Sequence, residues 1–256
     1  MKKSITISLA QTPVVKADIP KNVAQHLTFV QESATLGADV VVFPELSLTG
    51  YELELAQKLA LSSRSEWFQP LSRAAVEHNI IVIAGCPLEK ANSTKPTIAA
   101  VICFPDGEVG FYSKQYLHDG EDEYCVSGDK NYLFNLNGHE IALAICADFA
   151  NPAHSDKAAT LGADIYLVSA LISEKGYPVD AEILAGIANK HQIPVLLANH
   201  ISQTGGWQTC GNNTVWNAQG RVVASSQHNQ PCLVLCTIAG REVTEARLVT
   251  FEHSSY

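Results

Sequence analysis

The sequence predicts an α/β protein built as a four-layer αββα sandwich with two pseudo-symmetric halves. Two observations carry this prediction: apolar strand-like runs alternate with helix-like stretches, and a set of landmarks occurs twice along the chain. Continuous apolar runs such as Ile80–Ala84 are typical of strands that are covered on both faces of a sheet. Two such halves, packed sheet against sheet with helices outside, give four layers.

The first landmark is the tetrapeptide Leu-Gly-Ala-Asp, which occurs at residues 36–39 and again at 161–164. Each copy closes a helix-like stretch, where glycine is a common stop signal, and each leads into an apolar strand. The predicted strands are Val40–Phe43 and Ile165–Val168. A Gly-Tyr pair then follows each strand, at 50–51 and at 176–177. The tetrapeptide therefore marks equivalent points in the two halves.

The second landmark is a histidine before a buried strand. His78 precedes the predicted strand Ile81–Gly85, and His191 precedes Pro194–Asn199. A turn with glycine follows at the same distance in both halves, first Asp106-Gly107 and then Gln219-Gly220. These turns predict hairpins between Ile98–Phe104 and Val109–Ser113, and between Thr214–Trp216 and Arg221–Ser225. Because no linker-like segment lies near the midpoint, we expect a single domain over residues 1–256.

Composition narrows the class of function. The chain has 256 residues with 17 basic and 26 acidic side chains, which gives a net charge of −9. This negative charge argues against nucleic acid or an anionic membrane as partner and favours a small-molecule substrate. Seven cysteines, mostly in apolar runs and without metal-binding or redox spacing, predict a reduced, cytoplasmic protein without a metal site. The apolar stretch Ile5–Ala10 is interpreted as a first core strand rather than a secretion signal, and no apolar run is long enough to cross a bilayer.

Three candidate catalytic residues stand at the ends of predicted strands, where α/β folds place their sites. Glu45 directly follows a buried strand, so its pKa should rise toward that of a general base; the alternative is a surface or helix-capping glutamate. Lys114 ends a hairpin strand ahead of an acidic loop at 119–123, and the alternative is a solvated edge lysine. Cys146 lies between a strand and a helix, whose dipole would lower the thiol pKa; the alternative is a buried structural cysteine.

Together these segments resemble the carbon–nitrogen hydrolase (nitrilase/amidase) superfamily. The resemblance rests on Phe43-Pro44-Glu45-Leu46 with Gly50-Tyr51, on Tyr112-Ser113-Lys114-Gln115-Tyr116-Leu117, and on Ala144-Ile145-Cys146-Ala147-Asp148 with Pro152. It extends from Ile7–Gln11 to Gly162–Asp164 and so covers nearly the whole chain. It implies a four-layer αββα sandwich, a homodimer or higher oligomer formed through the helix after the cysteine, and a second glutamate after the lysine. Glu121 fits the family spacing better than Glu123.

The resemblance also implies a mechanism without metal or organic cofactor. Glu45 takes the proton of Cys146, the thiolate attacks an amide or carbamoyl-amine carbonyl, and a thioester forms as ammonia or an amine leaves. Lys114 and the backbone N–H of Ala147 would stabilise the oxyanion, while Glu121 would hold Lys114. Two further residues are expected to bind substrate, Tyr51 and Asp148, the latter with helix capping as its alternative.

Other functions remain open on the sequence alone. They are a nitrilase acting on a small nitrile, a Cys/His hydrolase using His118 or His154, and a non-catalytic binding member of the fold. The substrate is not specified by the motifs, but no basic residue follows Cys146 before Lys157, which argues against an acid-bearing ω-amidase substrate. Nearby acidic residues instead favour a neutral or cationic substrate. The loops expected to shape its pocket are Leu53–Trp67, Ser173–Asp180 and Ser202–Gln208, the last containing Trp207.

Overall fold

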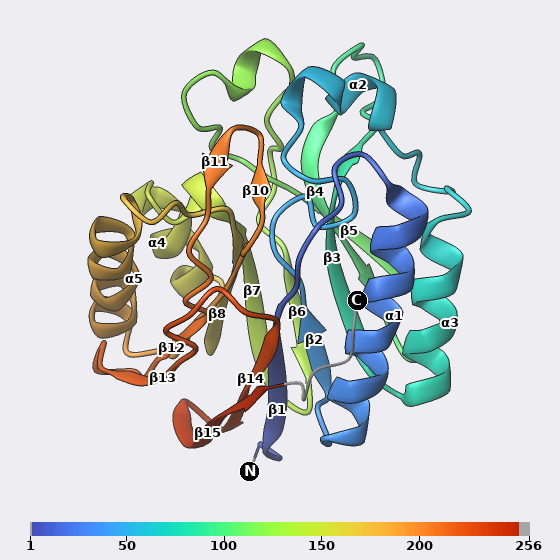
Figure 1. Ribbon diagram of the computed structural model, residues 1–256. Helices are drawn as coiled ribbons and strands as arrows, with labels where there is room; N and C mark the ends of the chain where they lie inside the picture. Colours follow the sequence, from blue (N-terminus) through green and yellow to red (C-terminus); the bar gives the residue numbers. More distant parts are fainter. Residues whose placement is uncertain (1, 251–256) are drawn as a thin grey trace.

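The computed structural model describes residues 2–250, which form two large β-sheets that face each other (Figure 1). The seven-stranded sheet has the order β15 (Glu242–Thr250), β14 (Cys232–Ala239), β1 (Ile5–Gln11), β2 (Val40–Val42), β3 (Ile81–Leu88), β4 (Thr97–Cys103) and β5 (Val109–Ser113). The six-stranded sheet has the order β13 (Val222–Ser225), β12 (Thr214–Trp216), β9 (Val195–Asn199), β8 (Ile165–Ala170), β7 (His139–Ile145) and β6 (Leu133–Leu136). A separate small hairpin consists of β10 (Gln203–Thr204) and β11 (Trp207–Gln208).

Helices cover the outer faces of both sheets. The longer helices α1 (Ile19–Thr35) and α3 (Phe68–His78) pack on the larger sheet, and α4 (Pro152–Thr160) and α5 (Tyr177–His191) lie on the other side (Figure 1). The short elements are α2 (Ala56–Leu59) and the 3₁₀ turns η1 (Leu53–Leu55), η2 (Glu121–Glu123) and η3 (Cys146–Asp148). The arrangement confirms the predicted four-layer αββα sandwich. Within residues 2–250, no helix combines the length and apolar character needed to span a bilayer.

The alternation of side chains along each strand explains why the strands are apolar on both faces. In β2, Val40 and Val42 belong to the cluster between the two sheets, whereas Val41 packs into the cluster beneath α1 and α3. In β7, Leu143 joins the same inter-sheet cluster and Ala144 faces the helices of the second half. Since both faces exclude water, a strand gains stability from apolar residues at every position.

The two halves repeat each other, as the sequence predicted. Strands β1, β2 and β3 run parallel and are followed by the antiparallel β4 and β5, and β7, β8 and β9 are followed in the same way by β12 and β13. The Leu-Gly-Ala-Asp copies make matching bonds. Asp39 Oδ2 accepts the N–H of Thr6 in β1 at 2.7 Å, and Asp164 Oδ2 accepts that of Glu140 in β7 at 2.9 Å.

Matching backbone conformations support the repeat, with one exception. Asn79 and Gln192 end α3 and α5 in left-handed conformations, with φ of 51° and 53°. The two Gly-Tyr pairs, however, are not equivalent. Gly50 has a φ of 78° in a loop, while Gly176 caps the start of α5 with a φ of −79°. Their difference has a physical cause, because Pro178 favours the first turn of a helix and nothing comparable follows Tyr51.

The sequence analysis did not predict how the last two strands would be used. β14 pairs antiparallel with β1 along its whole length, from Ile5 opposite Ile238 to Gln11 opposite Cys232. The C-terminal strands therefore complete the sheet of the first half and hold β1 in its interior. This placement agrees with the interpretation of residues 5–10 as a core strand.

Gly85 in β3 is the point where the larger sheet touches the loop after β2. A Cβ added there would lie 2.2 Å from the backbone N of Leu46 and 2.7 Å from the carbonyl O of Pro44. Gly85→Ala should therefore displace the Glu45 loop and destabilise the protein by about 1–3 kcal/mol, the usual cost of overpacking. Gly186→Ala is the matched control, because a Cβ at this position of α5 meets no atom within 4 Å. Urea unfolding should show this control unchanged or stabilised by up to about 1 kcal/mol; equal stability of both variants would contradict the prediction.

Candidate active site

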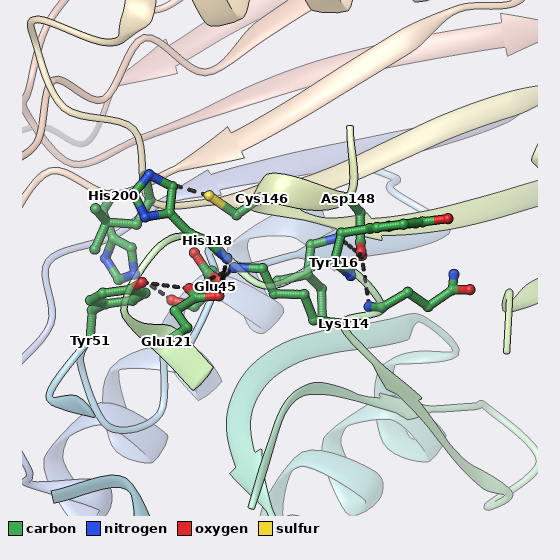
Figure 2. Close-up of polar contacts among 12 residues, drawn as sticks. Glu45, Tyr51, Lys114, Tyr116, His118, Glu121, Cys146, Asp148 and His200 are labelled. Atoms are coloured by element: carbon green, nitrogen blue, oxygen red, sulfur yellow. Dashed lines mark hydrogen bonds and ion pairs between the residues drawn. The ribbon is translucent and has the colours of Figure 1, made fainter. Parts of the chain in front are cut away.

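The three residues predicted to be catalytic come together at one end of the two sheets. Glu45 follows β2, Lys114 follows β5 and Cys146 follows β7, so the larger sheet supplies two of them and the smaller sheet the third. Figure 2 shows their side chains gathered with Glu121 and Tyr51. The strand ends thus assemble a site from segments far apart in the sequence.

Lys114 is the centre of this cluster. Its Nζ lies 2.7 Å from Glu45 Oε1 and 2.7 Å from Glu121 Oε1, and all three side chains are fully buried. Burial alone would lower the pKa of the ammonium, but the surrounding acidic groups, Glu45 foremost, raise it above its usual value. Lys114 therefore remains a positive charge, and the acidic loop expected to hold it does so through Glu121.

Glu45 keeps one carboxylate oxygen available. Its Oε1 accepts from Lys114, whereas no described residue hydrogen bonds to the buried Oε2. Burial raises the pKa of Glu45 to about 7, although the ammonium of Lys114 acts in the opposite direction. Its backbone carbonyl also accepts a hydrogen bond from Nε2 of the buried His200. The result is a fixed carboxylate whose proton affinity suits a base at neutral pH.

Cys146 stands on a strained turn. It directly follows β7 with a φ of 46°, a left-handed conformation that is unusual for a residue with a side chain. The residue is partly exposed, and its Sγ lies 3.6 Å from the carbonyl oxygen of Leu171. This turn presents the sulfur at the end of the strand.

The expected lowering of the Cys146 pKa by a helix dipole is wrong. The helix α4 begins only at Pro152, with Asn151 as its cap, so Cys146 does not lie at the start of that helix. Burial raises the thiol pKa well above its usual value, and the charge of Glu45 raises it further while Lys114 opposes the change. The thiol is therefore protonated at rest and needs a base. Ala147 lies in the first turn of η3, where backbone N–H groups have no acceptor within the helix.

The geometry distinguishes the two candidate glutamates in the loop after Lys114. Glu121 is fully buried and accepts hydrogen bonds from Lys114 and from the hydroxyl of Tyr51 through Oε1, and from the N–H of His118 through Oε2. Glu123 is exposed and makes no bond to Lys114. Tyr51 is thereby fixed at the edge of the cluster.

Asp148 does not occupy the position expected for a substrate contact. Its side chain is fully buried, and it is absent from the wall of the cavity around Cys146. Oδ1 accepts from the N–H groups of Gln115 and Tyr116, both at 2.9 Å. Oδ2 accepts from the N–H of Ile145 at 2.9 Å and from the Tyr112 hydroxyl at 2.6 Å. Since all its bonds are internal, Asp148 ties the loop after Lys114 to the turn of Cys146, and it does not cap α4.

A cavity of about 330 Å³ lies beside Cys146. Cys146, Ala147 and Tyr51 line it, and much of its remaining wall is apolar. Trp207 also contributes to the wall, from the loop that the sequence analysis expected to shape the pocket. Within residues 2–250, no group of three or more His, Cys, Asp or Glu side chains is arranged to hold a metal ion. The cavity matches the size range of small-molecule sites.

The two histidines of the alternative Cys/His mechanism have different environments. His154 is buried between the hydroxyls of Tyr112 and Tyr166, at 2.8 and 2.7 Å, and lies outside the cavity. His154 therefore lies neither at the surface nor in the cavity. His118 lines the cavity, which the sequence did not reveal because only the fold of its loop places it there. Asp180, the last residue of the segment Ser173–Asp180 that was expected to shape the pocket, also lines the cavity, from the first turn of α5.

Comparisons with known proteins agree with this geometry. The model of the carbon–nitrogen hydrolase family matches residues 6–248. The chain belongs to this family. It is 26% identical to a 2-oxoglutaramate amidase of Bacillus subtilis, over 94% of this chain and 93% of the relative. It is 25% identical to the omega-amidase YafV of Escherichia coli K12, over 88% of this chain and 86% of the relative. An amidase structure from Nesterenkonia sp. AN1 superimposes with a TM-score of 0.84 at 22% identity, covering 91% of this chain and 90% of that chain, which shows a shared fold.

Family membership confirms the predicted superfamily and the predicted class of enzyme. The chain is a cysteine-dependent carbon–nitrogen hydrolase, because the family match covers the segments that carry Glu45, Lys114 and Cys146.

Asp148→Asn tests how far this carbon–nitrogen hydrolase depends on the bonds between the lysine loop and the cysteine turn. An amide has one acceptor oxygen and cannot satisfy both sets of donors, so unfolding free energy should fall by about 1–3 kcal/mol. We expect kcat to fall more than KM rises, since Asp148 acts by positioning and lies outside the cavity. Asp156→Asn, on the exposed face of α4, should change neither the urea midpoint nor kcat. An Asp148→Asn enzyme with unchanged kcat would contradict the positioning role.

Proposed function

We propose that this hydrolase cleaves the carbon–nitrogen bond of small amides through a thioester on Cys146, with Glu45 as general base. One observation carries the proposal: a buried carboxylate with a raised pKa has one oxygen bound to Lys114 and the other without a described partner. Cys146, a thiol with a raised pKa of its own, lies within electrostatic reach of this carboxylate. Such a pair can exchange a proton near neutral pH.

The proposed reaction proceeds in two halves. Glu45 takes the thiol proton as Sγ of Cys146 attacks the amide carbonyl carbon, and the carbonyl oxygen becomes an oxyanion beside Lys114 Nζ and the Ala147 N–H. The intermediate collapses, Glu45 gives its proton to the leaving ammonia, and a thioester remains. Water then attacks the thioester while Glu45 again accepts a proton, and the acid leaves with the thiol restored. Glu121 holds Lys114 throughout, and Tyr51 contacts the substrate at the cavity wall.

Amides fit this site better than nitriles for two reasons. Two relatives that match most of the chain, 2-oxoglutaramate amidase and omega-amidase, are amidases by name. An amide carbonyl also develops a full oxyanion on attack, which the fixed ammonium of Lys114 is placed to stabilise. Carbamoyl amines share this carbonyl and belong to the same proposal.

We also propose a cellular compartment and an assembly state for the enzyme. All seven cysteines are free thiols, which supports a reducing compartment, and we place the protein in the cytoplasm. We further propose that residues 1–256 act as one domain and that it assembles as a homodimer or larger homo-oligomer through α4.

A panel of small substrates tests the proposed reaction. Wild-type enzyme should release ammonia from butyramide, and Cys146→Ala should lower kcat by about 10³-fold or more, because the nucleophile is lost. Cys103→Ala is the matched control, since this buried cysteine of β4 lies outside the cavity and its loss should leave kcat unchanged. Equal ammonia release by wild type and Cys146→Ala would refute the thioester route. Ammonia from butyronitrile but not from butyramide would favour a nitrilase.

The pH dependence of kcat/KM tests the assignment of Glu45. A base with a pKa of about 7 must lose its proton to act, so kcat/KM should fall as the pH drops below about 7 and level off above it. Glu45→Gln should abolish the reaction, whereas His118→Gln should retain the same acid limb. If the acid limb disappeared in His118→Gln instead, the cavity histidine would be the base and the proposed role of Glu45 would fail.

A further inference from the structure

Asp180 is an unpaired acid in the cavity that contains Cys146. It lies in the first turn of α5, half-buried, and its side chain lines the same 330 Å³ space. Within residues 2–250, no side chain or backbone group forms a hydrogen bond or ion pair with its carboxylate. Among the described residues that line the cavity there is also no lysine or arginine. The space beside the nucleophile therefore carries a negative charge without a positive partner.

The electrostatic surroundings of Asp180 compensate this charge only in part. Burial raises its pKa, and among the described residues the imidazole of His118, which lines the same cavity, lowers it. A partly desolvated carboxylate is stabilised when a cation enters within a few ångströms of it. A carboxylate entering the same space would meet repulsion instead.

An adjoining cavity has the same sign. This cavity of about 570 Å³ shares three wall residues with the first, namely Tyr51, His118 and Trp207. Its acidic wall residues are Glu52, Glu54, Asp119 and Glu123. The one lysine or arginine among its described wall residues, Lys16, is already paired with Glu52 at 2.9 Å. A negative potential there attracts cationic substrates and slows anionic ones.

The apolar part of the cavity wall indicates what kind of chain a substrate would have between its amide group and a positively charged group. Phe149, Leu171, Ile172 and Val179 are apolar and line the same cavity as Cys146 and Asp180. A short aliphatic chain can pack against such side chains, while a polar chain would lose hydration without gaining hydrogen bonds. The cavity thus combines an amide-reactive end, an apolar wall and a negative charge.

We propose that Asp180 determines substrate specificity at this site, selecting small aliphatic amides that carry a protonated amino group and disfavouring those that carry a carboxylate. The inference rests on the proposed amidase activity and names its substrate class. Asp180 takes no part in bond making at Cys146. It forms an ion pair with the distal ammonium of the substrate and so lowers KM for cationic amides.

Three amides of similar length separate charge from shape: neutral valeramide, cationic γ-aminobutyramide and anionic succinamate. Wild-type enzyme should show a higher kcat/KM for γ-aminobutyramide than for succinamate. Asp180→Asn, which keeps the shape and removes the charge, should reduce this ratio by about tenfold or more, mainly through KM. Its kcat/KM for valeramide should stay within about twofold of wild type, because a neutral chain does not use the charge. Glu182→Gln is the matched control, since it removes an exposed negative charge from the same helix outside the cavity.

The outcomes distinguish the two proposals. If wild type and Asp180→Asn hydrolyse valeramide equally but show the same ratio of kcat/KM for γ-aminobutyramide to kcat/KM for succinamate, Asp180 does not set specificity. A wild-type preference for succinamate would also overturn the inference while leaving the amidase activity intact. An equal loss of the ratio in Glu182→Gln would assign the effect to overall charge and refute a specific role. If wild type hydrolyses none of the three, the proposed amidase function fails and the specificity falls with it.

Discussion

The ammonium of Lys114, fully buried between the carboxylates of Glu45 and Glu121, is the interaction on which the site depends. Any one of these charges alone would be costly at this depth, and removing one would leave the others without compensation. The three must therefore be brought together during folding, although they come from separate loops. Burial still leaves Glu45 with a raised pKa, and no described residue hydrogen bonds to its second oxygen, while the thiol of Cys146 has a raised pKa of its own.

The scaffold holds this cluster by backbone contacts as much as by side chains. Gly85 allows the loop that carries Glu45 to lie directly on β3, at a distance that no larger residue permits. The carboxylate of Asp148 accepts hydrogen bonds from N–H groups of the loop after Lys114 and of the end of β7. These bonds fix the lysine loop to the cysteine turn. The imidazole of His200 holds the carbonyl of Glu45 from the second sheet. These hydrogen bonds thus connect the two sheets around Glu45, Lys114 and Cys146.

The fold and the central residues were predictable because they depend on patterns local to each strand. Buried parallel strands appear as apolar runs, and residues directly after them, such as Glu45 and Cys146, share one edge of the structure. The pKa of Cys146 was not predictable, since it depends on burial and on the charges of Glu45 and Lys114 from the other sheet. The bonds of Asp148 and the place of His118 in the cavity likewise depend on tertiary packing, and that of Asp180 depends on where α5 lies. The pairing of β14 with β1 joins the two ends of the chain, and no short sequence window contains that information.

The internal repeat offers two places for a reactive centre, and only one is used. Cys146 directly follows β7, and the residue that directly follows β1, the matching strand, is Thr12. At that second place Gln11, the last residue of β1, forms hydrogen bonds with its neighbours through its side-chain amide. Its amide oxygen accepts from the hydroxyl of Ser226, and its nitrogen donates to the carbonyls of residues 228 and 230. In one half this place is thus occupied by Cys146, which lines the cavity, whereas in the other half it is closed by internal hydrogen bonds of Gln11. The two halves share an architecture but contribute differently, one to the candidate active site and the other to the stability of the fold.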